Sequence, residues 1–211
     1  YAKMSSNGQA NAGNGLDPND DSRVAEVIAE CTETISREVA GLKAMVDEFS
    51  RFARLPEARL ENADLNEVVI QAVGLYEDRL DGVKITLDLD RDSPTAMLDV
   101  EQIKRVFVNL IDNALNALAD SQEKLITITT KHDRERGLLF AEVADTGQGI
   151  AREDFKRLFQ PYFSRRDSGT GLGLAIVQRI IFEHSGRIKA ERNQPGGAKF
   201  VIEIPIANPE Q

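Results

Sequence analysis

Three short segments, in a fixed order along the chain, constrain the fold more than any other feature. Residues 109–113 read NLIDN, residues 145–149 read DTGQG and residues 169–173 read GTGLG. The first segment lies in a predicted helix, the second follows a predicted strand, and the third precedes a strongly apolar helix. Taken singly, the first segment fits a solvated helix face and the second fits an Asp-Gly turn. Taken together, they predict a fold that brings a helix face, a strand end and a helix start around one pocket.

The first segment supplies side-chain amides. Asn109, Asn113 and Asn116 lie at positions i, i+4 and i+7, so they share one face of the helix. Asparagine is not favoured inside helices, and a row of it opposite an apolar face indicates a functional role. Amide oxygens are hard ligands of the kind that Mg²⁺ accepts alongside phosphate oxygens and water. This face therefore predicts a magnesium site.

The second segment supplies a carboxylate next to a flexible turn. Asp145 ends a predicted strand, and Gly147 and Gly149 follow it. A carboxylate in this position can accept a hydrogen bond from the exocyclic amine of adenine, and glycines let the main chain approach the base. We therefore expect an adenine site here.

The third segment supplies main-chain N–H groups at the start of a helix, which bind phosphate oxygens. Its spacing is neither the dinucleotide fingerprint nor a Walker loop. Arg165 and Arg166 lie just upstream and offer cations for a terminal phosphate. The three segments together predict binding of Mg-ATP without a Walker loop.

Charge and cysteine content exclude several classes of protein. The net charge of −9 argues against nucleic acid as the main partner, because such a surface needs basic residues. The single cysteine, Cys31, cannot form an internal disulfide, which fits a reducing cytoplasm. No apolar run approaches the roughly 18 residues of a membrane helix. We expect a cytoplasmic location, and the chain's first residues read as the middle of a larger protein.

The N-terminal part of the chain is predicted to form a linker and a long helix. Residues 1–21 are rich in Asn, Gly, Ser and Asp, as in flexible linkers. Residues 22–56 carry a heptad-like apolar stripe that Pro56 ends. A stripe of this length favours a bundle or dimer helix, and the alternative is an ordinary helix packed on its own domain. Its members are Val24, Ile28, Cys31, Ile35, Leu42, Met45, Phe49 and Phe52.

Residues 60–208 mix helix and strand patterns. Asp64 and Asp99 are predicted to cap helices, and the Pro195–Gly197 turn joins the last two strands. The pattern predicts an α+β two-layer sandwich: a mixed sheet with helices on one face. Predicted helices cover residues 64–80, 99–119, 151–158 and 171–184, and predicted strands cover 83–89, 95–98, 125–131, 138–144, 187–191 and 198–204.

Four motifs in this region carry a resemblance to a known family. NLIDNALNAL (109–118) resembles an N box, DTGQGI (145–150) a first glycine box, FQPYF (159–163) an F box and GTGLGLAI (169–176) a second glycine box. The chain thus resembles the ATP-binding catalytic domain of two-component sensor histidine kinases, in the gyrase, heat-shock chaperone, histidine kinase and MutL (GHKL) superfamily. The resemblance implies a Bergerat-type ATP-binding fold. MVDEFSRFARLPE (45–57) is similar to the NtrY-type nitrogen-regulation branch.

The resemblance also implies a role for each matching residue. Asn113 would be the principal magnesium ligand, with Asn109 assisting, and both would be catalytic. Arg166 would be a catalytic cation, replacing a cation that other family members carry near Asn116. The remaining cofactor-binding residues would be Asn116 at the magnesium face, Asp145, Gly147 and Gly149 at the adenine, Phe159 and Phe163 as anchors of a mobile lid, and Arg165, Thr170, Gly171, Leu172 and Gly173 at the triphosphate.

By resemblance, the γ-phosphate of ATP would pass to a histidine on a dimerisation hairpin and then to a response-regulator aspartate. Residues 22–55 would be the second hairpin helix and would form a homodimer, and the parent protein would be membrane-anchored. His132 and His184 do not fit the acceptor role, so we expect the acceptor outside this sequence. Two alternatives stay open: a GHKL-type ATPase, disfavoured because Asn109 stands where the glutamate base would be, and a nucleotide-gated dimerisation module without activity.

Overall fold

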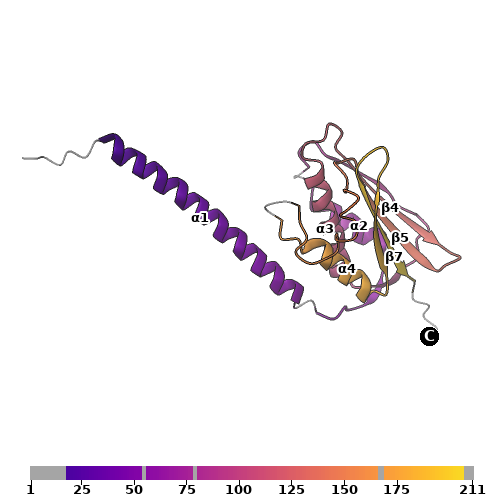
Figure 1. The fold of residues 1–211 in the computed structure, drawn as a ribbon. Helices are drawn as coiled ribbons and strands as arrows, with labels where there is room; N and C mark the ends of the chain where they lie inside the picture. Colours follow the sequence, from indigo (N-terminus) through magenta and orange to yellow (C-terminus); the bar gives the residue numbers. More distant parts are fainter. Residues whose placement is uncertain (1–17, 54–55, 78–79, 166–168, 207–211) are drawn as a thin grey trace, which may run out of the picture. The chain divides into compact units, whose positions relative to one another are not determined.

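The computed structural model describes residues 18–53, 56–77, 80–165 and 169–206, which divide between two units (Figure 1). One unit is Tyr1–Val46 and the other is Asp47–Gln211. Helix α1 (Pro18–Ala53) begins in the first unit and ends in the second. None of the described helices is long and apolar enough to span a membrane.

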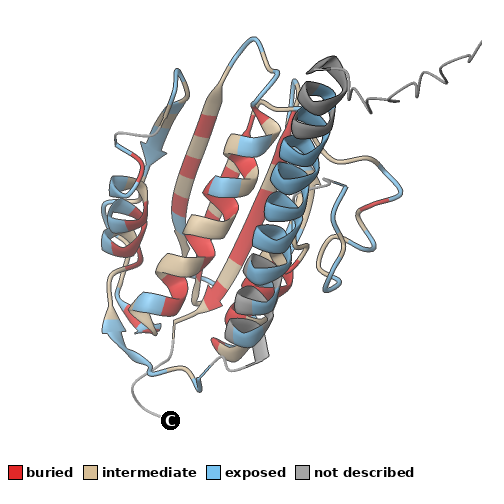
Figure 2. Ribbon diagram, turned by 90° about the vertical axis from the view of Figure 1, so that its left-hand side faces the viewer, coloured by how far each residue is buried: buried red, intermediate tan, exposed pale blue. Residues whose placement is uncertain are grey.

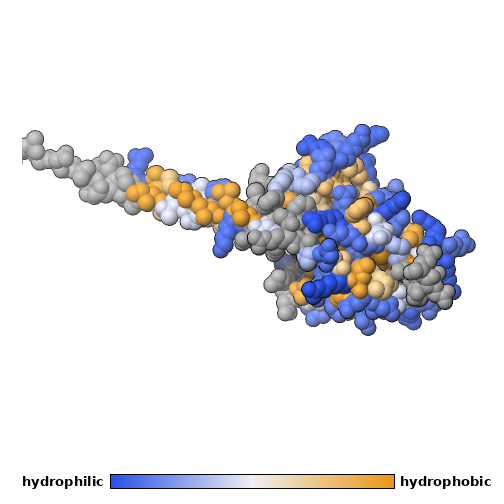
Figure 3. Space-filling view, turned by 90° about the horizontal axis from the view of Figure 1, so that it is seen from below, coloured by the Kyte–Doolittle hydropathy of each residue, from blue (hydrophilic) through white to orange (hydrophobic). Residues whose placement is uncertain are grey.

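Helix α1 exposes a row of large apolar side chains along its length (Figure 3). Ile28, Ile35 and Leu42 follow one another at heptad spacing, and each is about 60% exposed. Because these side chains are exposed, the predicted apolar stripe is available to pack against a partner helix. The side chains of Val24, Met45, Phe49 and Phe52 lie outside the described parts. Of the predicted linker at residues 1–21, residues 1–17 also lie outside them, and residues 18–21 belong instead to α1, which begins at Pro18.

A five-stranded mixed sheet forms one layer of the second unit. Its strand order is β2–β4–β5–β7–β6, with β2 and β4 parallel and the other pairs antiparallel. A separate two-stranded sheet pairs β1 with β3. The strands are β1 (Glu61–Ala63), β2 (Lys84–Asp88), β3 (Ala96–Leu98), β4 (Leu125–Asp133), β5 (Leu138–Asp145), β6 (Arg187–Arg192) and β7 (Ala198–Pro205).

Helices α2 (Leu65–Gly74), α3 (Val100–Ala117) and α4 (Gly173–Glu183) form the second layer and cover one face of the sheet (Figure 1). Their buried residues face the strands (Figure 2). Strand β5 alternates strictly between buried and half-buried residues, as expected of a strand with one covered face. The predicted α+β two-layer sandwich with a mixed sheet is confirmed.

Local sequence signals set where the helices begin. The Asp64 side chain accepts a hydrogen bond from the N–H of Asn66 (2.8 Å), and the Asp99 side chain accepts one from the N–H of Gln102 (3.0 Å). Both are N-caps, as predicted. Helix α2, however, ends at Gly74, several residues before the predicted end at residue 80.

The predicted helix at residues 151–158 is wrong: this segment forms consecutive turns. Most of its main-chain hydrogen bonds span three residues, as between Asp154 and Ala151, and one spans four. So short a helix is marginal unless packing supports it. Here the contacts of Asp154 and Phe159 with other parts of the fold set the local conformation instead.

His184 links the two helices that carry the N box and the second glycine box. Its Nε2 accepts a hydrogen bond from the N–H of Asp99 (2.9 Å), and its Nδ1 lies 2.8 Å from the carbonyl of Ile180. Nδ1 must therefore carry the proton, since a carbonyl only accepts. The buried ring is a structural link and not a free acceptor of a phosphoryl group.

Candidate functional site

The asparagine row on α3 meets the start of α4 at one point. The Asn109 Nδ2 donates to the carbonyl of Arg105 (2.9 Å), which turns Oδ1 toward Gly173. A Cβ on Gly173 would lie 3.0 Å from that Oδ1. The N box and the second glycine segment, some sixty residues apart in sequence, are therefore neighbours. Asn113 is half-buried one turn further along α3.

The donor set at this face fits a hard cation. Among the described residues, no three His, Cys, Asp or Glu side chains are grouped so that they could hold a metal ion. A metal at this face would therefore depend on amide oxygens and on the phosphates of a bound nucleotide, which is the arrangement that Mg²⁺ favours. Asn116 is exposed, and its Nδ2 donates to the carbonyl of Asp112 (2.6 Å).

Asp145 presents one free acceptor at the end of β5. The residue is 4% exposed, and its Oδ1 accepts hydrogen bonds from the N–H groups of Gly147 (2.8 Å) and Ala198 (3.2 Å). Its Oδ2 accepts none from the described residues. Burial raises the pKa of this carboxyl above its ordinary value, and the two N–H groups partly oppose that rise. An amine donor on a ligand would satisfy Oδ2.

The first glycine segment packs directly against the end of α3. A Cβ on Gly147 would lie 2.5 Å from the carbonyl oxygen of Ala117, so only glycine fits. Gln148 donates its N–H to that same carbonyl (3.3 Å). Gly149 adopts a positive φ of 73° and lies against Gly197. The structure thus brings the predicted adenine segment beside the asparagine helix.

The F-box residues 159–163, called the F segment below, lie against both the second glycine segment and the core. A Cβ on Gly171 would lie 2.6 Å from the main chain of Tyr162 and 2.7 Å from that of Phe163. The Phe159 ring packs edge-on against Phe200, with 6.5 Å between ring centres. The Arg157 guanidinium lies 4.7 Å from the centre of the Phe163 ring. These contacts are those of an anchored loop.

One predicted triphosphate residue, Leu172, is placed where only its main chain can reach a ligand. Leu172 is fully buried in the core, so its main chain alone can face a phosphate. That N–H lies 3.4 Å from the Thr170 hydroxyl, which accepts from it. Gly171 and Gly173 flank this position at the start of α4.

Arg165 is engaged within its own segment. Its guanidinium contacts Glu153 (2.9 Å) and the buried Asp154 (2.5 Å). The hydrogen bond that Arg165 donates to Glu153 and the charge of Asp154 raise the pKa of Arg165. The pKa of Glu153 is lowered by its own main-chain N–H and then by Arg165. A phosphate at Arg165 would have to compete with these carboxylates. Arg166, the predicted catalytic cation, lies outside the described residues.

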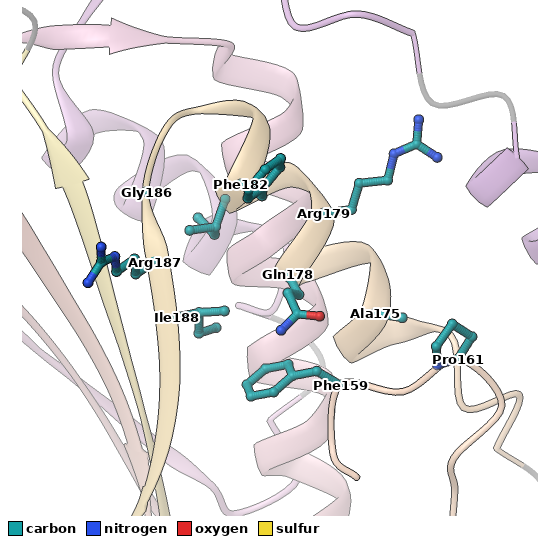
Figure 4. Close-up of a pocket in the computed structure, with 10 residues that line it drawn as sticks. Phe159, Pro161, Ala175, Gln178, Arg179, Phe182, Gly186, Arg187 and Ile188 are labelled. Atoms are coloured by element: carbon teal, nitrogen blue, oxygen red, sulfur yellow. The ribbon is translucent and has the colours of Figure 1, made fainter. Parts of the chain in front are cut away.

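A hollow of about 490 Å³ lies between α4, β6 and the F segment, away from this site (Figure 4). Phe159 is the one residue of its lining that was predicted to bind the nucleotide, and Pro161 also comes from the F box. Gln178 and Phe182 come from α4, and Ile188 comes from β6. The predicted residues of α3 and of the first glycine segment do not line this hollow; they lie where Gly147 packs against Ala117 and Gly173 lies beside Asn109.

Sequence reasoning missed the residues that hold Asp145 in place. Asn193 donates its Nδ2 to the main-chain carbonyl of Asp145 (2.8 Å), and Gly197 lies against the same atom. These residues belong to the β6–β7 turn, whose Pro-Gly-Gly sequence predicted only a turn. A contact between residues about fifty positions apart leaves no local signal in a single sequence.

Comparison with known proteins identifies the family of this domain. A family model described as histidine kinase-, DNA gyrase B- and HSP90-like ATPase matches residues 98–208. The FixL sensor protein of Bradyrhizobium diazoefficiens is 38% identical over 65% of this chain, and the nitrogen regulation protein NtrY of Azorhizobium caulinodans is 34% identical over 83%. The chain spans 27% and 23% of the lengths of these two proteins.

Solved structures show the same fold. Full-length ShkA in complex with AMPPNP superimposes with a TM-score of 0.70 at 27% identity, covering 85% of this chain and 39% of ShkA. The catalytic domain of the histidine kinase ThkA superimposes with a TM-score of 0.63 at 30% identity, covering 70% of this chain and 96% of that domain. The chain therefore belongs to the histidine kinase-, DNA gyrase B- and HSP90-like ATPase family, as an ATP-binding catalytic domain of the sensor histidine kinase type.

Proposed function

We propose that this chain binds Mg-ATP at the junction of α3, β5 and α4 and transfers the γ-phosphate to a histidine of a dimerisation hairpin. The observation that carries the proposal is that both glycine segments pack against α3: Gly173 lies beside Asn109, and Gly147, which follows Asp145 by two residues, lies against Ala117. Asp145 Oδ2 would accept the adenine amine, and the N–H groups at the start of α4 would bind phosphate oxygens.

Asn113 and Asn109 would hold magnesium through their amide oxygens. When bound, magnesium neutralises charge on the β- and γ-phosphates. The protein's own contribution is positioning, because phosphoryl transfer requires an in-line approach of the acceptor nitrogen. The unprotonated nitrogen of the imidazole would attack through its lone pair, so that a phosphorus–nitrogen bond forms while the bond from the γ-phosphorus to the bridging oxygen breaks. ADP would leave with that electron pair, and the proton on the other ring nitrogen would pass to water.

The acceptor histidine would lie on a different segment. The chain has two histidines, and His184 is committed to its contacts with Asp99 and Ile180. His132 lies in β4, where its main-chain N–H donates to the Asp90 side chain. Neither lies on an exposed helix face.

We propose that the phosphoryl group passes from the hairpin histidine to a response-regulator aspartate. We also propose a homodimer through the exposed stripe of α1. The location would be cytoplasmic, within a membrane-anchored sensor, where ATP and a receiver domain are available.

Hydrolysis of ATP is an alternative function that the residues of this site support less well than transfer to histidine. A water nucleophile needs a general base within hydrogen-bond reach. Asn109 occupies the position one turn before Asn113, and an amide cannot take a proton there. Transfer to a histidine nitrogen makes a smaller demand on a protein base.

The deciding experiment uses ATP labelled on the γ-phosphate, with Mg²⁺, in the presence and absence of a hairpin segment from the parent protein. Label on a histidine only when the hairpin is present supports the proposal. Steady release of free phosphate, unchanged by the hairpin, would show an ATPase. Tight binding with neither product would show a nucleotide-gated dimerisation module.

Replacing Asn113 with alanine should reduce the Mg²⁺-dependent part of ATP affinity about tenfold, because one amide oxygen of the cation site is lost. Stability should change by less than about 0.5 kcal/mol, since the side chain is only half-buried on a helix face. Calorimetric titration with Mg²⁺ and with EDTA measures the difference. Glu101→Ala, on an exposed position of the same helix, is the control. Full Mg²⁺ stimulation in Asn113→Ala would remove this residue from the site.

A further inference from the structure

The pairing between β5 and β7 stops one step before Asp145. The register runs from Leu138 opposite Pro205 to Ala144 opposite Lys199, so the next pair along the strands is Asp145 and Ala198. At that step, the Ala198 N–H donates to the Asp145 side-chain Oδ1 (3.2 Å). The main-chain carbonyl of Asp145 accepts from Nδ2 of Asn193 (2.8 Å). Two side chains therefore complete the hydrogen bonding where the strand pairing ends.

Asn193 is itself fixed by the turn to which it belongs. Its N–H donates to the carbonyl of Gly197 (3.1 Å), and its Oδ1 accepts from the N–H of Gln194 (3.0 Å). Because Oδ1 is held by Gln194, the plane of the carboxamide is fixed, and one of the two Nδ2 hydrogens is directed at the Asp145 carbonyl. The amide is therefore a rigid contact and not a flexible surface group.

Glycine is what allows this turn to lie so close to the end of β5. Gly197 has a φ of 100°, and a Cβ on it would lie only 1.8 Å from the carbonyl oxygen of Asp145. A Cβ on Gly149 would lie 3.0 Å from the Gly197 carbonyl oxygen. The turn thus contacts both parts of the adenine segment, its carboxylate and its second glycine.

We propose that Asn193 is a positioning residue that acts through Asp145 to select bases carrying an exocyclic amine. By taking up the Asp145 carbonyl, Asn193 leaves the Ala198 N–H directed at Oδ1. Oδ1 then receives two donors, from Ala198 and Gly147, and Oδ2 is left as the single outward acceptor. A 6-amino purine supplies the matching donor, and a 6-oxo purine places an acceptor against it. The proposal rests on the proposed function, because it assumes the base lies at Asp145.

The test compares non-hydrolysable analogues of ATP and of inosine triphosphate, which has an oxygen in place of the amine. In Asn193→Ala, the dissociation constant for the ATP analogue should rise about threefold to tenfold while that for the inosine analogue changes little. The ratio of the two affinities should fall accordingly. Asn193→Asp, which keeps the side-chain size but lacks the donor, should lower the ratio at least as far.

The pH dependence of ATP-analogue binding gives a second readout. It should stay unchanged if Asn193 has only a structural role. The N–H of Ala198 favours the ionised form of Asp145, so a loosened contact should raise the pH below which ATP-analogue binding is lost. Gln194→Ala is the matched control, because that side chain is exposed on the same turn and only its main-chain N–H is used. It should leave both readouts unchanged.

The outcomes separate this proposal from the one on which it rests. If the unaltered chain binds both analogues equally, the adenine role of Asp145 is wrong and the proposed function loses its base site. If the unaltered chain prefers the ATP analogue, and both Asn193 variants keep the same preference and pH dependence, only the positioning role is overturned. A change in Gln194→Ala as large as that in Asn193→Ala would overturn it equally.

Discussion

Gly171→Ala should lower the free energy of unfolding by about 2–4 kcal/mol and abolish measurable ATP binding. The residue has a φ of 69°, which costs a residue with a Cβ about 1 kcal/mol. The new Cβ would also lie 2.6 Å from main-chain atoms of Tyr162, which cannot rotate away as a side chain would. The F segment would have to move, and with it the Phe163 main chain that packs against the start of α4.

Two other glycines separate strain from collision in this experiment. Gly137 has a similar φ of 61°, but a Cβ there would meet nothing within 4 Å. Gly137→Ala should therefore cost only the backbone term, about 1 kcal/mol, and leave ATP binding intact. Gly196→Ala, with open space and an ordinary φ, should be neutral. Chemical denaturation and calorimetric titration measure both effects. If Gly171→Ala behaved like Gly137→Ala, the close packing of the F segment would be refuted.

Local patterns predicted most of the fold because they are consequences of burial on one face. The strands predicted at residues 125–131, 138–144 and 198–204 coincide with β4, β5 and β7, and the caps at Asp64 and Asp99 located the starts of α2 and α3. Strand β1, at three residues, carries too little pattern to be seen. The segment at residues 151–158 carried a helical pattern that tertiary contacts overrode.

In the candidate site, too, the local motifs could be predicted from the sequence and the long-range contacts could not. The asparagine row and the two glycine segments were visible in the sequence because their chemistry is local. The residues that hold Asp145 in place, Asn193 and Ala198, were not visible in the sequence. Both lie about fifty positions from Asp145, and only the folded topology brings them to it, so spacing along the chain gives no indication of these contacts.

Asp145→Asn should weaken ATP binding by about 10- to 100-fold while leaving the unbound protein as stable as before or more stable. The asparagine oxygen can still accept from Gly147 and Ala198, which places its NH₂ group where Oδ2 now lies. A donor then faces the donor of adenine. Binding of inosine triphosphate should suffer much less, because its 6-oxygen can accept from the new amide. Titrating both nucleotides tests this inversion.

Stability should respond in the opposite direction, for an electrostatic reason. Burial raises the pKa of Asp145 in the folded protein above its value in the unfolded chain. The folded state therefore gains from the neutral acid at low pH and loses that gain as the pH rises through the raised pKa. An amide carries no charge at any pH, so Asp145→Asn should flatten this part of the stability profile and raise the melting temperature near neutral pH.

Asp88→Asn, at an exposed carboxylate on β2, is the control and should change neither property. A lower melting temperature in Asp145→Asn, together with unchanged ATP affinity, would mean that the carboxylate stabilises the fold and does not bind the base.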